Sequence, residues 1–186
     1  MDHSERQFAY VAFEVRDEEA LNRLKLVADE FKKQKKGDAI RDDVHWLPYF
    51  NEVDKTEFWW PTEAERERWS AFWLATPLPK RHSPEMPMPP WDFGSMIDAI
   101  LDGEYELIGV TLVGSGRARF EIDPCAYPYG GISAIRTLVR AFGHTITSFD
   151  DGTGRVDNDP LGPRWDGSAL PAPASERSFW DRFRPH

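Results

Sequence analysis

Apolar residues recur along the chain at two spacings, and these spacings predict alternating strands and helices. Residues 8–15 are apolar at both alternating sets of positions, which predicts an interior strand covered on both faces. Asp17 then fits the N-cap of a helix that ends in a run of lysines before Gly37. The apolar face of this helix consists of Leu21, Leu24, Ala28 and Phe31.

The later part of the chain shows a second group of elements. Residues 104–113 and 117–122 predict two strands, and the Gly114-Ser115-Gly116 turn between them predicts a hairpin. Residues 144–149 predict a last strand. Between the hairpin and this strand lies a helix with its apolar face at Ile132, Ile135, Leu138, Val139 and Phe142.

The order strand, helix, interruption, strand, strand, helix, strand indicates the α+β class. Without the interruption it is the βαββαβ order of ferredoxin-like folds, whose sheet is antiparallel. A different α+β sandwich, with the same elements paired in another order, remains an alternative. We expect one domain over residues 1–150, followed by a Pro- and Gly-rich strap over 151–186 with an aromatic and basic end.

The interruption, at about residues 38–103, is a Trp-rich, partly helical insertion between the first helix and the second strand. Six of the eight tryptophans fall in it: Trp46, Trp59, Trp60, Trp69, Trp73 and Trp91. Thr62-Glu63-Ala64-Glu65 is a capping-box pattern, and it predicts a helix with Trp69, Phe72 and Trp73 on one face. We expect Trp69 and Trp73 to be mostly buried, as a cover for the sheet face that carries no helices, and at least one of Trp59 and Trp60 to be partly exposed. A shorter helix is expected to start at Asp92 or Ser95.

Charge and composition exclude several classes of function. The chain has 32 acidic and 23 basic residues and a net charge of −9, which disfavours nucleic-acid binding. No apolar run approaches the roughly 18 residues that a membrane span requires. The single cysteine excludes a disulfide scaffold and a Cys-based zinc site. With no signal-peptide pattern at the N-terminus, we expect a cytoplasmic location.

Aromatic and acidic residues interleave in the first part of the insertion, where Asp42 and Asp43 add to the acidic side chains. Tryptophan and tyrosine favour sites with one apolar and one wet side, so the segment predicts a recognition surface. The expected partner-binding residues are Trp46, Tyr49, Phe50, Glu52, Asp54, Glu57, Trp59 and Trp60.

An alternative site is a pocket between the sheet and the insertion. Its polar candidates are Cys125, Tyr127, Tyr129 and His144, and a Cys–His pair would permit nucleophilic chemistry if the two side chains met. The five histidines are dispersed, and no metal-ligand spacing or cofactor motif is present. We therefore expect no metal and no cofactor.

These observations favour a non-enzymatic acidic module that binds a basic protein. Bacterial immunity proteins and antitoxins often have this general form and inhibit by covering an active site, although no motif here assigns the chain to such a family. The alternative is a small enzyme or a small-molecule-binding protein that uses the pocket. A third hypothesis is a subunit that forms homo-oligomers through the open sheet face.

The end of the chain carries an aromatic cluster. Phe179, Trp180 and Phe183 would share one face of a helical turn, and Arg182 and Arg184 flank it. Exposed aromatics on a free tail are unfavourable, so we expect this segment to dock onto its own chain or onto a partner.

Overall fold

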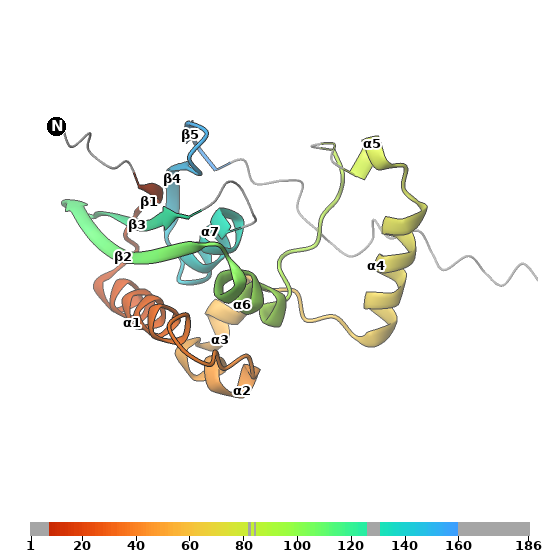
Figure 1. Ribbon diagram of the computed structural model, residues 1–186, viewed down its shortest axis with the longest axis horizontal. Coiled ribbons are helices and arrows are strands. Elements are labelled where there is room, and N and C mark those ends of the chain that lie inside the picture. The colour runs from red at the N-terminus through yellow and green to blue at the C-terminus, as the bar shows by residue number, and fades with distance from the viewer. Residues whose placement is uncertain (1–7, 82, 84, 126–130, 160–186) are drawn as a thin grey trace, which may run out of the picture. The chain divides into compact units, whose positions relative to one another are not determined.

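The computed structural model describes residues 8–81, 83, 85–125 and 131–159 (Figure 1). It has an α+β fold built on a five-stranded antiparallel sheet with the strand order β2-β3-β1-β4-β5. The strands are β1 (Ala9–Glu14), β2 (Tyr105–Gly114), β3 (Arg117–Pro124), β4 (Thr145–Asp150) and β5 (Arg155–Asp157).

The position of β1 confirms the expected interior strand. It lies between β3 and β4, with Val11 opposite both Phe120 and Phe149. The predicted hairpin of β2 and β3 is also present, and Gly116 adopts a φ of 69° in its turn, a value that favours glycine. The strand β5 was not predicted, because only three residues after the turn at 151–154 pair with β4.

Two long helices form a layer on one face of the sheet. These are α1 (Glu18–Gln34) and α7 (Gly131–Ala141). The predicted faces are buried, including Leu24, Phe31, Ile135 and Phe142. The guanidinium of Arg23 in α1 lies 5.1 Å from the Phe142 ring centre, so the two helices meet in the same layer.

The opposite face of the sheet is largely polar. The guanidinium of Arg119 lies 4.4 Å from the Tyr10 ring centre, and the Thr111 hydroxyl donates to Glu121 at 3.3 Å. Asp150 pairs across the strands with Tyr10 on this face. This composition differs from the apolar face that the homo-oligomer hypothesis assumes, and that hypothesis stays untested.

The two ends of the insertion are part of the sheet's own core. They form α2 (Asp43–Trp46), the 3-10 turn η1 (Leu47–Tyr49), α3 (Glu52–Lys55) and α6 (Phe93–Asp102). The indole of Trp46 is fully buried and stacks on Phe31 with ring centres 4.2 Å apart. Phe50 packs against Phe58, Phe93 and Phe142.

The middle of the insertion belongs to a second compact unit. The described chain divides into a first unit, residues 8–59 and 91–159, and a second unit that runs from residue 60 to residue 90. The second unit contains α4 (Glu63–Ala75) and α5 (Leu78–Arg81). The predicted capping box at the start of α4 is present, with both hydrogen bonds between Thr62 and Glu65 formed.

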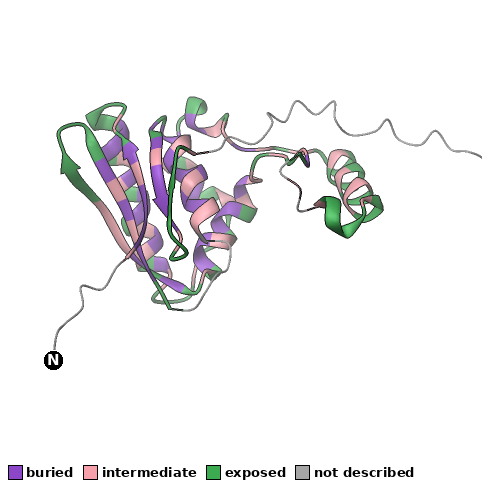
Figure 2. Cartoon of the chain, turned by 90° about the horizontal axis from the view of Figure 1, so that it is seen from above, coloured by how far each residue is buried: buried purple, intermediate pink, exposed green. Residues whose placement is uncertain are grey.

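Trp69 and Trp73 on α4 are partly buried, and their expected role as a cover for the sheet stays a prediction. No residue of this helix is fully buried (Figure 2). The apolar core consists of first-unit residues, and the second unit contributes only Met86 to the buried apolar side chains of the described chain. The expected partial exposure of Trp60 is confirmed, at 47%. The proposed docking of Phe179, Trp180 and Phe183 lies outside the described residues.

The first prediction compares Trp46 with Trp60. Trp46→Ala should lower the free energy of unfolding by about 3–5 kcal/mol, because it empties a fully buried indole site. Trp60→Ala, at a 47% exposed position, should cost less than about 1 kcal/mol. Denaturant unfolding at 25 °C measures both variants, and equal costs would contradict the assignment of Trp46 to the core.

Candidate functional site

The structure distributes the eight predicted partner-binding residues over different environments. Trp46 and Phe50 are buried in the core, and the side chain of Asp54 is completely buried. Their expected exposure is wrong, because the alternation of aromatic and acidic residues reflects short helices packed on the core. These three side chains are unavailable to a partner.

Asp54 is held in a buried ion pair. Its carboxylate accepts both terminal nitrogens of Arg23, and it also accepts the Asn51 backbone N–H at 2.8 Å. The Asn51 side chain accepts the Asp54 backbone N–H in return, which completes a capping box at the start of α3. Asp54 therefore fixes α3 against α1.

The other predicted residues differ in exposure and in the unit to which they belong. Glu52 is exposed, and Tyr49 is half-buried. Glu57 is half-buried and accepts the Arg140 Nε at 2.9 Å. Trp59 is half-buried in the first unit, whereas Trp60 belongs to the second.

A different set of acidic residues is brought together on α2 and α6. We call it the α2–α6 acidic surface: Asp42, Asp43, Asp92, Asp98 and Asp102, with Arg41 among them. Both helices begin at one of these aspartates, because the Asp42 and Asp92 side chains accept N-terminal N–H groups. A Cβ atom at Gly94 would lie 3.4 Å from Asp43 Oδ1 and 3.7 Å from Asp92 Oδ1, so these two carboxylates converge.

Arg41 joins the other end of this surface. Its Nη1 lies 2.7 Å from Asp98 Oδ1, and its Nη2 lies 2.5 Å from Asp102 Oδ1. The hydrogen bonds from Arg41 hold the pKa of Asp102 below its usual range. Asp98 and Asp102 are four residues apart on the exposed face of α6, and this spacing is a signal that the sequence already contains.

A partly buried lysine, Lys35, lies at the C-terminal end of α6, where acidic residues are also found. An aspartate there opposes the helix dipole. The Lys35 Nζ donates to the carbonyls of Ile100, Leu101 and Gly103 at 2.7–3.1 Å, which satisfies the open end of the helix. Desolvation lowers the pKa of Lys35.

Apolar side chains border the acidic surface. Val44, next to Asp43, is 74% exposed. The Trp59 backbone N–H donates to the Trp91 backbone carbonyl at 2.9 Å, and the side chains of both residues are half-buried. The surface therefore combines negative charge with apolar area.

Two of the four alternative pocket residues, Cys125 and His144, lie apart in the structure. Cys125 follows β3 at the end of the sheet where Ala9 begins β1. His144 precedes β4 at the opposite end, where β1 finishes at Glu14. The length of β1 separates these ends by about 17 Å, so a Cys–His pair is excluded. Tyr127 and Tyr129 lie outside the described residues.

His144 is a buried neutral histidine. It stacks on Phe13 with ring centres 4.9 Å apart, and its Nδ1 accepts the Arg16 backbone N–H at 3.1 Å. The proton of the neutral ring is therefore on Nε2, which is buried and lacks a hydrogen-bond partner within the described structure. Burial lowers the pKa of His144 to about 4.

Sequence reasoning also missed a charge cluster on α7. Arg136 and Arg140, one helical turn apart, both pair with the nearly buried carboxylate of Asp159. Arg140 also donates to Thr137 Oγ1 at 3.2 Å. Burial lowers the pKa of Arg136 to about 10. The cluster links the residues that follow β5 to α7. Asp159 is too far from the two arginines in sequence for a local pattern to predict the cluster.

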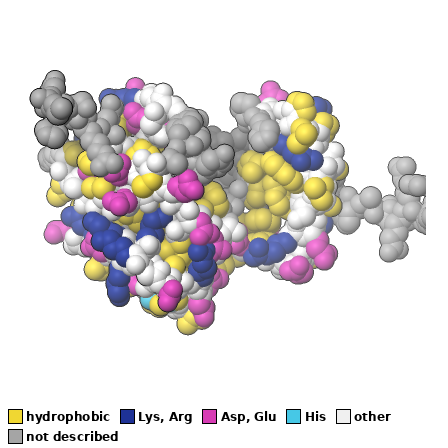
Figure 3. Space-filling model, viewed as in Figure 1, with side chains coloured by type: hydrophobic (Ala, Val, Ile, Leu, Met, Phe, Trp, Pro, Cys, Tyr) yellow, Lys and Arg dark blue, Asp and Glu magenta, His cyan; other side chains and the backbone are white. Residues whose placement is uncertain are grey.

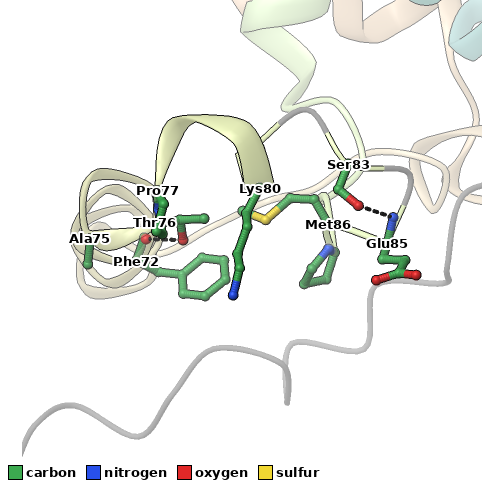
Figure 4. A pocket seen from close by; sticks show the side chains of 9 residues that line it. Phe72, Ala75, Thr76, Pro77, Lys80, Ser83, Glu85 and Met86 are labelled. Atoms are coloured by element: carbon green, nitrogen blue, oxygen red, sulfur yellow. Dashed lines mark hydrogen bonds between the residues drawn. The ribbon is translucent and has the colours of Figure 1, made fainter.

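The second unit contains an open pocket of about 490 Å³ (Figure 4). It is lined by Phe72, Ala75, Thr76, Pro77, Lys80, Ser83, Glu85, Met86 and Pro87. The space-filling view shows hydrophobic side chains gathered on this unit, whereas charges of both signs intermingle on the first unit (Figure 3). The pocket lies within the insertion and not between the insertion and the sheet.

Comparison with known proteins assigns neither a family nor a function to this chain. No family model, curated protein or solved structure matches the chain. Across the described residues, no group of three or more histidine, cysteine or acidic side chains is arranged to hold a metal ion. None of the described helices has the length and apolar character of a membrane span.

Asp54 and Glu52 provide a test of the buried pair. Asp54→Ala should lower the free energy of unfolding by about 3–5 kcal/mol, because it leaves the partly buried Arg23 without its carboxylate. Glu52→Ala removes an exposed pair with Lys55 and should cost less than about 1 kcal/mol. Chemical denaturation at pH 7 measures both, and a cost for Asp54→Ala as small as for Glu52→Ala would refute the structural role.

His144 predicts a pH dependence of stability. Its pKa is lower in the folded chain than in the unfolded chain, so the unfolded state binds the proton first as the pH falls. The stability contribution is complete above about pH 6.5 and should fall by on the order of 2 kcal/mol as the pH approaches 4. His144→Asn keeps a hydrogen-bond acceptor and does not titrate. The unfolding free energies of the two proteins, measured from pH 7.5 to 4.5, should diverge by this amount, and parallel curves would contradict the buried neutral state.

Proposed function

We propose that this chain is a non-enzymatic acidic module that binds a basic protein through the α2–α6 acidic surface. The observation that carries the proposal is the charge of that surface. Five carboxylates and one exposed guanidinium, that of Arg41, lie on two adjoining helices, so acidic groups outnumber basic ones among the residues of this surface. Such a concentration of one sign attracts an oppositely charged partner and speeds its association.

The rigidity of the surface supports the same proposal. Trp46 anchors α2 by its stack on Phe31, and its Nε1 donates to the Ile40 carbonyl at 2.7 Å. The opposite side of α6 is buried through Phe93, Met96, Ile97, Ile100 and Leu101. Carboxylates on packed helices lose little freedom on binding, so less ordering cost opposes association.

The proposal extends to the functional class of the module, the topology of its sheet and its cellular compartment. We assign the module to the inhibitor class that includes immunity proteins and antitoxins, since an acidic surface suits the cover of a basic active site. For the topology we propose a ferredoxin-like arrangement extended by β5, supported by the order of β2, β3, β1 and β4 and their antiparallel pairing. A single exposed thiol at Cys125 supports the cytoplasm as the compartment.

A charge-removal experiment tests the proposal. The full chain, immobilised, should capture a basic protein from extracts of its native host, and the complex should weaken strongly with added salt. The variant Asp43→Asn/Asp98→Asn/Asp102→Asn should bind the captured protein at least about tenfold more weakly, because it removes three charges from the surface. Calorimetry or surface plasmon resonance measures the affinities.

The control removes the same charge elsewhere. Asp29→Asn/Glu104→Gln/Glu106→Gln changes three exposed acidic residues outside the α2–α6 acidic surface and should bind within about twofold of the unmodified chain. Equal losses of affinity in the two triple variants would show that binding depends on net charge alone, and would reject the α2–α6 acidic surface as the binding site. A captured partner that is acidic, or binding that is insensitive to salt, would reject the proposed function.

A further inference from the structure

We propose that the pocket of the second unit binds the aromatic segment 178–184 of the same chain. The proposal does not depend on the function of the α2–α6 acidic surface. It rests on the shape and chemistry of the pocket, on the apolar area that surrounds it, and on the composition and tether of the segment.

The pocket has the form of an aromatic side-chain site. Phe72 from α4 and Met86 from the segment after α5 lie on opposite sides of one open space (Figure 4). Lys80 and Glu85 add one charge of each sign to this apolar lining. A volume of about 490 Å³ accommodates one or two large aromatic side chains and lies in the range of small-ligand sites.

Several large apolar side chains of the second unit are exposed. Leu74 and Leu78 are 73% and 66% exposed, and Trp69 and Trp73 are only half-buried. Contiguous exposed apolar area of this kind marks a docking surface. The polar face of α4, by contrast, begins with a run of glutamates and arginines at 63–68.

The C-terminal segment matches the pocket in chemistry. Residues 178–184 read SFWDRFR and contain three aromatic side chains, one aspartate and two arginines. The aspartate complements Lys80, and the arginines complement Glu85.

The tether favours binding within one chain. The 18 residues between Asp159 and Ser178 span up to about 60 Å when extended. A covalent tether of this length gives the segment a high effective concentration at the pocket of its own chain, and a partner or a second copy would have to exceed that concentration to compete.

Site-specific photo-crosslinking in the full chain tests the proposal. The photoreactive residue p-benzoylphenylalanine replaces Phe72, or in a second variant Ala75, which is exposed and also lines the pocket. After irradiation, proteolysis and mass spectrometry should find the crosslink on residues 178–184, in material that migrates as a single chain. The same photoreactive residue at Leu74, on the same helix but outside the pocket lining, should give at least about tenfold less of this product.

A variant of the segment completes the test. Phe179→Ala/Trp180→Ala/Phe183→Ala should abolish the crosslink from position 72 or 75. Crosslinks that join two chains would identify a second copy as the occupant and overturn the proposal. Equal crosslinking from Leu74, or crosslinking unaffected by the triple variant, would also overturn it.

Discussion

The stack of Trp46 on Phe31 is the contact on which the rest of the first unit depends. It carries the start of the insertion into the helix layer, where Phe50 continues the aromatic core against Phe58, Phe93 and Phe142. Because Trp46 ends α2, its burial also fixes the direction in which Asp42 and Asp43 are presented. The aromatic residues at the start of the insertion, which the sequence suggested as a recognition surface, are therefore core residues that hold the neighbouring acidic helix in place.

The charged residues divide into two groups with different consequences. Asp54 with Arg23, and Asp159 with Arg136 and Arg140, are nearly or completely buried carboxylates held by arginines, and they tie short segments to the long helices. Their removal is costly because a charge left alone in the interior loses its water and gains no partner. The carboxylates around Arg41 are largely exposed, so their ion pairs add little to the stability of the fold. Their main effect is on the electrostatic attraction of a charged partner.

The two units bury their aromatic side chains to different extents. In the first unit the sheet and helices enclose the rings of Phe13, Phe31, Trp46 and Phe120 completely. In the second unit, α4 carries two half-buried tryptophans beside an open pocket, with little buried apolar partner area among its described residues. The C-terminal segment 178–184 is the occupant that we propose for this pocket.

The sequence by itself determined the elements with strong local signals. The periodicity of residues 8–15 and the Gly114-Ser115-Gly116 turn predicted an interior strand and a hairpin, and the Thr62–Glu65 pattern predicted the start of α4. Local spacing is enough for these features because each depends on neighbours within a few residues. Short elements such as α2, α3 and β5 were missed, since three or four residues carry no periodicity.

Tertiary structure alone decided which polar and aromatic residues are available for function. Asp54 and Asp98 are both acidic residues in short helical segments, yet Asp54 is buried against Arg23 from α1 and Asp98 is exposed beside Arg41. Similarly, strand register alone places Cys125 and His144 at opposite ends of the sheet. Burial and proximity arise from contacts between residues 31 to more than 100 positions apart, and such contacts leave no trace in local spacing.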